Sequence, residues 1–247
     1  MILQTTSRLN VSTQGTISNR VPGDTITDLF TAPIGGPGSL IKDGDGGLVR
    51  SRATNKYGGA NGSTIVSNGF IRINGGDNRL PVNTTLQLGE NGSTNAGTFD
   101  LNGFNQTVAG LVTAGSAGVN HQIVNGSSSG TISTLTVNYN GATPQVFDGL
   151  IGGFSGTNIG LVKGGTGTLT LTANSAYSGP TTVNAGKLRV FSNSVPRPYV
   201  IADGASLDVV NTDPSNAFQM SSLTLGSTSA SGLTLELTAA TLPSNGV

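Results

Sequence analysis

The sequence offers few residues of the kinds that bind metals or carry out acid–base catalysis. His121 is the only histidine, and the chain has no cysteine. A multi-histidine metal site or a thiolate metal site therefore cannot be assembled from these residues. We predict a structural role for His121, which lies in the polar stretch "AGVNHQIV".

Asp43 and Asp45 are the closest approach to a metal-binding motif. They lie in "DGDGG", which resembles half of a calcium loop, because calcium prefers several carboxylate and carbonyl oxygens. A related stretch later in the chain has Gly164 and Thr166 at the corresponding positions. We interpret the pair as a solvated turn, and the sequence leaves calcium binding open.

Asp100 and Asp208 occupy equivalent positions in "GTFDL" and "ASLDV". A carboxylate used once per repeat could indicate a glycosidase pair. In a stack of coils about 4.8 Å apart, however, 108 intervening positions would separate the two groups by roughly 20 Å or more. That is too far for a catalytic pair, so we predict outward-facing strand positions.

Four basic residues also recur in pairs. Lys42 and Lys163 each flank glycines at a predicted corner, where capping of carbonyl groups or exposure to solvent is expected. Arg72 and Arg189 are expected at exposed positions of strands. We predict no catalytic, cofactor-binding or metal-binding residue, no cofactor and no enzymatic activity.

These pairs arise from an internal repeat. "LIKDGDGGL" (Leu40–Leu48) and "LVKGGTGTL" (Leu161–Leu169) share the order Leu, branched apolar residue, Lys, any residue, Gly, any residue, Gly, any residue, Leu. Downstream, "TIVSNGFIRI" (Thr64–Ile73) matches "TTVNAGKLRV" (Thr181–Val190). The repeat divides one continuous segment, residues 1–247, into three parts. They are the tail of a preceding unit (1–25), unit 1 (26–144) and unit 2 (145–247).

Short apolar alternations within the units predict strands. Stretches such as "TLQL", "TLTL" and "KLRV" alternate with period two, and glycine, asparagine and proline separate them. In Thr168–Thr172 we expect Leu169 and Leu171 to point inward and the threonines to face water. An all-β, open stack of coils explains why the units repeat, because each coil buries its leucines only against its neighbours.

The charge balance and hydropathy exclude several classes of protein. Twelve acidic residues balance twelve basic ones, and charged residues make up only 10% of the chain. The chain thus lacks the basic surface typical of nucleic-acid-binding proteins. No apolar run is long enough for a membrane-spanning helix, and residues 1–25 contain no signal-peptide core. We expect any export signal or membrane anchor to lie outside this sequence.

Residues Gly160–Val190 resemble the autotransporter-associated β-strand repeat of bacterial passenger domains. That pattern runs approximately Gly-Leu-x-Lys-x-Gly-x-Gly-Thr-Leu-x-Leu, then a polar gap, then Gly-x-Thr-x-Val-x-Ala-Gly-x-Leu-x-Leu. Unit 1 departs from it at Gly47, Arg50 and Asn68, which replace Thr, Leu and Ala. The resemblance implies a right-handed, single-stranded parallel β-helix, open at both ends. It also implies a Gram-negative-type bacterium, with location outside the cell or at the cell surface through a C-terminal outer-membrane translocator barrel absent from this chain.

The function expected from this resemblance is that of a structural or adhesive passenger segment, which provides a stalk and an interaction surface. Its partners would be a host-surface or extracellular-matrix protein, a glycan, or further copies of itself. Two alternatives stay open: a β-helical polysaccharide-active enzyme, which needs a cluster of Asp with Arg or Lys on one coil face, and a phage or fibre β-solenoid module. Tryptophan is absent, and the four tyrosines and eight phenylalanines are scattered, which counts against a lectin groove.

Overall fold

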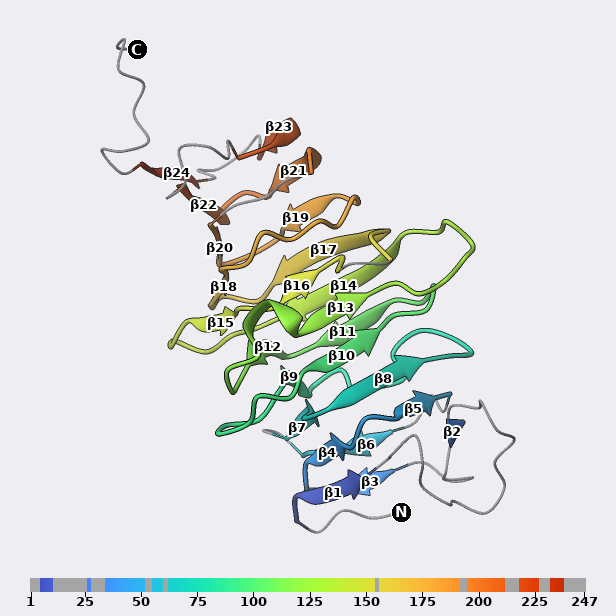
Figure 1. The fold of residues 1–247 in the computed structure, drawn as a ribbon. Helices are drawn as coiled ribbons and strands as arrows, with labels where there is room; N and C mark the ends of the chain where they lie inside the picture. Colours follow the sequence, from blue (N-terminus) through green and yellow to red (C-terminus); the bar gives the residue numbers. More distant parts are fainter. Residues whose placement is uncertain are drawn as a thin grey trace.

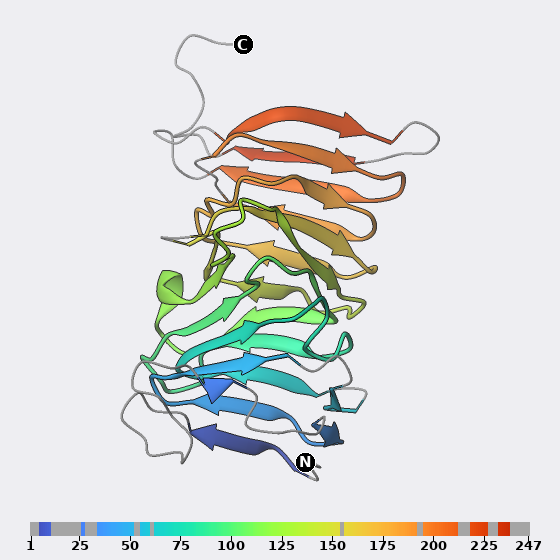
Figure 2. The ribbon, with the colours of Figure 1, turned by 90° about the vertical axis from the view of Figure 1, so that its right-hand side faces the viewer.

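The computed structural model shows an all-β chain whose parallel strands stack into a solenoid (Figures 1 and 2). The structure describes residues 5–10, 26–27, 34–51, 55–59, 62–153, 156–191, 195–211, 218–226 and 232–237. Within these ranges the helical structure is a single 3₁₀ turn, Gly118–Asn120. The predicted parallel β-helix is thus confirmed. Most of the predicted tail, residues 1–25, lies outside the described residues.

The strands form five sheets, which we number 1 to 5. Sheet 1 contains β1 (Ser7–Asn10), β4 (Leu40–Asp43), β7 (Ser63–Val66), β9 (Thr85–Leu88) and β12 (Gly110–Thr113). Sheet 2 contains β2 (Ile26–Thr27), β5 (Gly47–Arg50), β8 (Gly69–Ile73), β10 (Gly97–Asp100), β13 (Gln122–Val124) and β16 (Leu150–Ile151). Sheet 3 contains β11 (Gln106–Val108), β14 (Ser133–Asn138), β17 (Ile159–Gly164), β19 (Thr181–Val183), β21 (Arg197–Ile201) and β23 (Met220–Leu225). Sheet 4 contains β15 (Gln145–Phe147), β18 (Thr168–Leu171), β20 (Lys187–Val190), β22 (Ser206–Asn211) and β24 (Gly232–Leu237). Sheet 5 contains β3 (Gly35–Gly36) and β6 (Lys56–Tyr57).

Sheets 1 and 4 follow one another along one side of the solenoid. The backbone N–H of Leu111 in β12 donates to the side-chain oxygen of Gln145 in β15 at 2.9 Å. The N–H of Asp148 likewise donates to the hydroxyl of Thr113 at 3.0 Å. Side-chain hydrogen bonds therefore join the two sheets end to end.

The coils shorten toward the C-terminal end. Ser7 of β1 pairs with Leu40 of β4, 33 residues later, whereas Thr168 of β18 pairs with Lys187 of β20, only 19 residues later. Sheet 2 ends at β16, while sheets 3 and 4 continue to β23 and β24. A coil that crosses two sheets instead of three needs fewer residues to return to its starting face.

The interior is filled by alternate residues of each strand, as period-two alternation requires. Leu48, Leu169 and Leu171 are at most 3% exposed and belong to one continuous apolar cluster. The predicted inward direction of Leu169 and Leu171 is confirmed. Thr170 differs from the prediction: it is only 8% exposed. It pairs with Val146 on one side and Arg189 on the other, and same-face neighbours on adjacent strands lie close enough to cover it.

The two copies of the repeat lie on different faces of the solenoid. Strands β4 and β7 are in sheet 1, but their counterparts β17 and β19 are in sheet 3. Strands β5, β8 and β10 are in sheet 2, while their counterparts β18, β20 and β22 are in sheet 4. The repeat is therefore not a whole number of coils. Equivalent side chains of the two units point in different directions around the axis.

Candidate functional site

A buried lysine holds the corner of the repeated motif in unit 1. The Nζ of Lys42, in β4, donates to the carbonyl oxygens of Gly44 and Asn68, each at 2.8 Å. Gly69 follows with a φ of 67°, and a Cβ there would lie 2.8 Å from the lysine Nζ. A glycine is therefore needed beside the lysine, both for the left-handed backbone and for space.

The same corner recurs in unit 2 on a different face. The Nζ of Lys163, in β17, donates to Gly164, Gly165 and Ala185 at 2.6, 2.8 and 3.3 Å. Gly186, with a φ of 65°, takes the place of Gly69. Asn68 replaces the alanine of the repeat pattern without changing the contact, because the lysine bonds to the backbone carbonyl at this position.

Both lysines are completely buried, so the carbonyl-capping prediction is confirmed and the solvent-exposed alternative is wrong. Burial lowers the pKa of Lys163 to about 8. Burial also lowers the pKa of Lys42 to about 8, although Asp43 and Asp45 act in the opposite direction. An amine that is enclosed and bonded to backbone carbonyls meets no substrate from solvent, so these contacts support a structural role.

Buried tyrosine–threonine pairs close the same coils. The hydroxyl of Tyr177 lies 2.8 Å from that of Thr181. In unit 1 the hydroxyl of Tyr57 lies 2.7 Å from that of Thr64, which also lies 2.9 Å from the hydroxyl of Thr84. Burial raises the pKa of Tyr57 to about 12.

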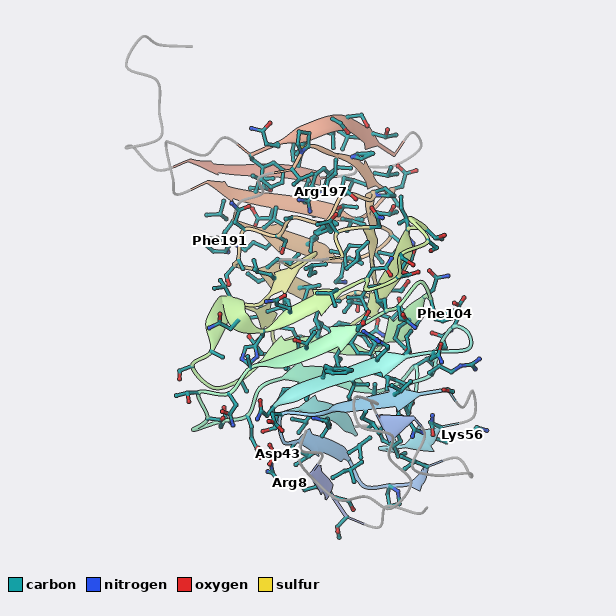
Figure 3. The ribbon with its side chains drawn as sticks, turned by 45° about the vertical axis from the view of Figure 1, so that its right-hand side comes forward. Arg8, Asp43, Lys56, Phe104, Phe191 and Arg197 are labelled. Carbon is teal, nitrogen blue, oxygen red and sulfur yellow. The ribbon has the colours of Figure 1, made fainter. Side chains whose placement is uncertain are left out.

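Arg197 occupies the interior of the C-terminal coils (Figure 3). Its guanidinium carbon lies 3.7 Å from the centre of the Tyr177 ring, and its Nη2 donates to the carbonyl of Ser175 at 2.7 Å. The cation stacks on the aromatic ring and satisfies a backbone carbonyl. The sequence analysis did not single out Arg197, because no matching residue in unit 1 marks it.

Asp100 is only 3% exposed, so the predicted solvent-facing position is wrong. Its Oδ2 accepts a hydrogen bond from Nε of Arg72 at 2.7 Å. Its Oδ1 accepts from the N–H groups of Asn102 and Gly126 at 2.9 and 2.8 Å. Asp100 does point to the outer side of β10, but these donors cover it. Every contact holds the carboxylate in place, which argues against catalysis by this group.

Asp208 is buried to the same extent and contradicts the same prediction. Its Oδ2 lies 3.7 Å from Nε of Arg189 and 3.9 Å from Nζ of Lys187. Arg72 and Arg189 are partly exposed, with 38% and 35% of their side chains accessible. Their predicted strand positions are thus correct, but each forms an ion pair with a buried carboxylate. The two aspartates lie in different sheets, so the structure does not bring them together.

His121 is buried and fixed by two backbone groups, which agrees with a structural role. The N–H of Gly97 donates to its Nδ1 at 3.2 Å, so Nδ1 carries no proton. Its Nε2 lies 3.1 Å from the carbonyl of Ala114 and must be the donor. Burial lowers the pKa of the ring, although the carbonyl of Ala114 opposes this. His121 is the neutral Nε2–H tautomer and is bonded at both nitrogens.

Asp43 is part of an ion-pair cluster near the N-terminal end of the solenoid (Figure 3). Arg8 lies 2.8 Å from the carboxylate of Asp43 and 2.5 Å from that of Glu90. Desolvation alone would raise the pKa of Asp43, but the N–H of Gly44 and the guanidinium of Arg8 together lower it. Within the described ranges, no three His, Cys, Asp or Glu residues come together as metal ligands. Asp43 is engaged by protein groups, and Asp45 lies exposed in the adjoining turn.

The outer side of sheet 2 carries a groove of about 380 Å³. We call it the sheet-2 groove. Its lining consists of Asp45, Asn68, Gly69, Phe70, Arg72, Ala96, Thr98, Asp100, Val124 and Gly126. It combines an aromatic ring, a guanidinium group, an exposed carboxylate, an amide and a hydroxyl. This is the cluster of Asp with Arg on one coil face that the sequence analysis did not find.

Sequence reasoning overlooked the groove because its residues come from separate turns and strands. The signal was nevertheless present at Gly47, where unit 1 departs from the threonine of the repeat pattern. A Cβ at Gly47 would lie 2.0 Å from Cζ of Phe70, so the phenylalanine ring rests on the glycine backbone. The glycine and the ring are thus two halves of one departure.

Comparison with known proteins gives one positive result. Residues 161–190 match the family model described as passenger-associated-transport-repeat. No curated protein and no solved structure gives a significant match. In the part of the chain that the structure describes, no helix is long and apolar enough to cross a membrane. The matched segment contains Lys163, Tyr177 and Thr181, which form the corner and the hydroxyl pair described above. Residues 161–190 are thus a passenger-associated-transport repeat, the repeat class that the sequence pattern predicted.

Proposed function

We propose that this chain is a segment of a secreted or cell-surface autotransporter passenger, in which it acts as an extended, rigid carrier of surface features. The match of residues 161–190 to the passenger-associated-transport-repeat carries this proposal. Stacking of every coil on its neighbours supports the extended shape, because a continuous apolar core resists bending between units.

The use of the recurring polar residues supports a structural role over an enzymatic one. The lysines bond to backbone carbonyls, the paired tyrosines to threonine hydroxyls, and Asp100 to two N–H groups and one guanidinium. A catalytic carboxylate or amine must reach a substrate with free bonding capacity. The groups that repeat along this chain have instead been used to close its coils.

Display at the cell surface tests the proposal. The chain would be placed between an export signal and an outer-membrane translocator in a Gram-negative host. Antibody labelling of intact cells should detect it, and the exposed segment should resist limited proteolysis. The matched control is Leu169→Lys, which disrupts the core and should yield a segment that protease degrades. If the wild-type chain stays in the periplasm while an established passenger reaches the surface, the proposal is wrong.

A further inference from the structure

The sheet-2 groove differs from the corresponding surface of unit 2 by a pair of coupled replacements. On the outer side of sheet 2, Gly47 pairs with Phe70. At the equivalent place in sheet 4, Thr168 pairs with Lys187. The first pair gives a bare backbone covered by a ring, and the second gives a hydroxyl beside a flexible cation. The arginine two residues later is present in both units, as Arg72 and Arg189.

The replacement turns an ordinary strand surface into a flat aromatic platform. Because the Phe70 ring lies on the backbone of Gly47, any side chain at position 47 would displace it. Phe70 stays partly exposed in this position. The guanidinium carbon of Arg72 lies 5.5 Å from the ring centre and holds one edge of the platform. A ring supported from beneath keeps its orientation, which lowers the entropic cost of stacking a ligand on it.

Arg72 is positioned to donate hydrogen bonds into the groove. Among the described residues its hydrogen-bond partner is Asp100, which binds Nε and leaves both Nη groups at the solvent side. Two backbone N–H groups hold Asp100, so the arginine is anchored to a fixed carboxylate. The amide of Asn68, the hydroxyl of Thr98 and the exposed carboxylate of Asp45 add further donors and acceptors along the groove.

The dimensions suit a short extended chain that lies along the solenoid axis. The lining spans four neighbouring strands, β5, β8, β10 and β13, which at about 4.8 Å per strand gives a length of about 14 Å. The volume of about 380 Å³ falls within the range of ligand sites, roughly 300 to 1,000 Å³.

We propose that the sheet-2 groove binds a neutral oligosaccharide, with Phe70 as the stacking platform and Arg72 as the principal hydroxyl-binding group. The apolar face of a pyranose ring matches the Phe70 ring, and its hydroxyls match the mixed donors and acceptors around it. Formal charges cancel here: Arg72 faces Asp100, and Asp45 offsets Lys42, whose Nζ lies beside Gly69 of the lining. A groove without net charge favours a neutral ligand over an acidic one.

The groove binds without cleaving. Glycoside hydrolysis requires two carboxyl groups that flank the scissile bond. Both oxygens of Asp100 are occupied by protein donors, which leaves Asp45 as the exposed carboxylate in the lining. This inference adds a ligand to the proposed passenger role and rests on it, since adhesion requires display at the surface.

Binding of neutral hexasaccharides to the purified 247-residue chain tests the inference. Cellohexaose, maltohexaose and xylohexaose serve as probes, with a galacturonic acid trimer as the acidic comparison, in saturation-transfer NMR and calorimetric titrations. We expect at least one neutral probe to bind without being shortened. Its amide shifts in the chain should centre on Asn68–Arg72 and Thr98.

The decisive variant restores the pair found in unit 2, Gly47→Thr with Phe70→Lys. It should fold, because the chain already carries this arrangement at Thr168 and Lys187, and it should weaken binding at least tenfold. Lys187→Ala, on the other face, should bind like the wild type. Failure of all three neutral probes, binding of the acidic trimer alone, shifts centred away from sheet 2, or unchanged affinity of the double variant would each overturn the inference. These results are independent of surface display, so either proposal can fail alone.

Discussion

Replacing Lys163 by methionine tests whether burial governs the charge of the repeated lysine. The substitution keeps a long apolar side chain but removes the ammonium group that binds three carbonyls. In the folded chain the pKa of Lys163 is about 8, compared with the ordinary value of 10.5. Between these values the unfolded chain binds more protons than the folded chain. The free energy of unfolding should therefore rise with pH across this window.

The magnitude follows from the pKa difference. A fully lowered lysine contributes a slope of up to about 1.4 kcal/mol per pH unit, or about 1.5 kcal/mol in total between pH 8 and 9.5. Lys42 has the same lowered pKa and should contribute a similar amount, which gives about 3 kcal/mol for the wild type. Lys163→Met should remove about half of this rise, and the double variant Lys42→Met/Lys163→Met should remove all of it.

The measurement is urea unfolding, followed by circular dichroism from pH 7.5 to 9.5 at constant ionic strength. The upper limit matters because the pKa of Tyr57 is raised to about 12. A raised tyrosine pKa contributes stability that is lost as pH rises above its ordinary value of 10, so it would mask the lysine effect there. A flat wild-type profile, or an equal rise in the double variant, would refute the reasoning. It would mean that the carbonyl oxygens keep both lysines charged beyond pH 9.5.

Two further pairs of variants test the packing. Leu169→Lys should lower the free energy of unfolding by at least the roughly 2 to 5 kcal/mol of a core truncation, whereas Thr170→Lys should cost only about 1 kcal/mol because the longer side chain can reach solvent; equal losses in denaturant melts would show that both faces of β18 are packed alike. Tyr177→Phe should cost about 1 to 3 kcal/mol, because it leaves the buried hydroxyl of Thr181 without its described partner. Tyr57→Phe should cost less, since its threonine keeps a second hydroxyl neighbour, and thermal melts that reverse this order would contradict the hydrogen-bond assignment.

The inward side of the coils could be predicted because it depends on local alternation alone. Leu169 and Leu171 are buried as their period-two spacing requires, and Lys163 caps carbonyls beside the glycines that flank it in the sequence. The outward side depends on which strands become neighbours. Thr170 and Asp100 were expected at the surface, but residues 19 to 28 positions away cover them. Sequence spacing within one strand carries no record of those partners.

The position of each unit around the axis was also beyond the repeat pattern. A repeat shows that two segments share a local structure, but the number of coils between them depends on loops and on the number of sheets per coil. The coil length falls from 33 to 19 residues along this chain. Asp100 and Asp208 consequently lie on different faces, although their sequence positions are equivalent.

Departures from the repeat have two different consequences, depending on the direction of the side chain. Arg50 points inward where the pattern has leucine, and its Nη2 donates at 2.6 Å to Asn55, whose amide also bonds to the backbone of Ile34 and Arg79. That departure is compensated within the core, because a buried charge must find partners inside the protein. Gly47 points outward, and its compensation is the Phe70 ring on the neighbouring strand, which stays partly exposed in a groove. Nothing in the fold requires an aromatic ring there, since Thr168 and Lys187 close the same surface in unit 2. A coupled outward departure that the scaffold does not need is therefore the feature most directly attributable to a ligand.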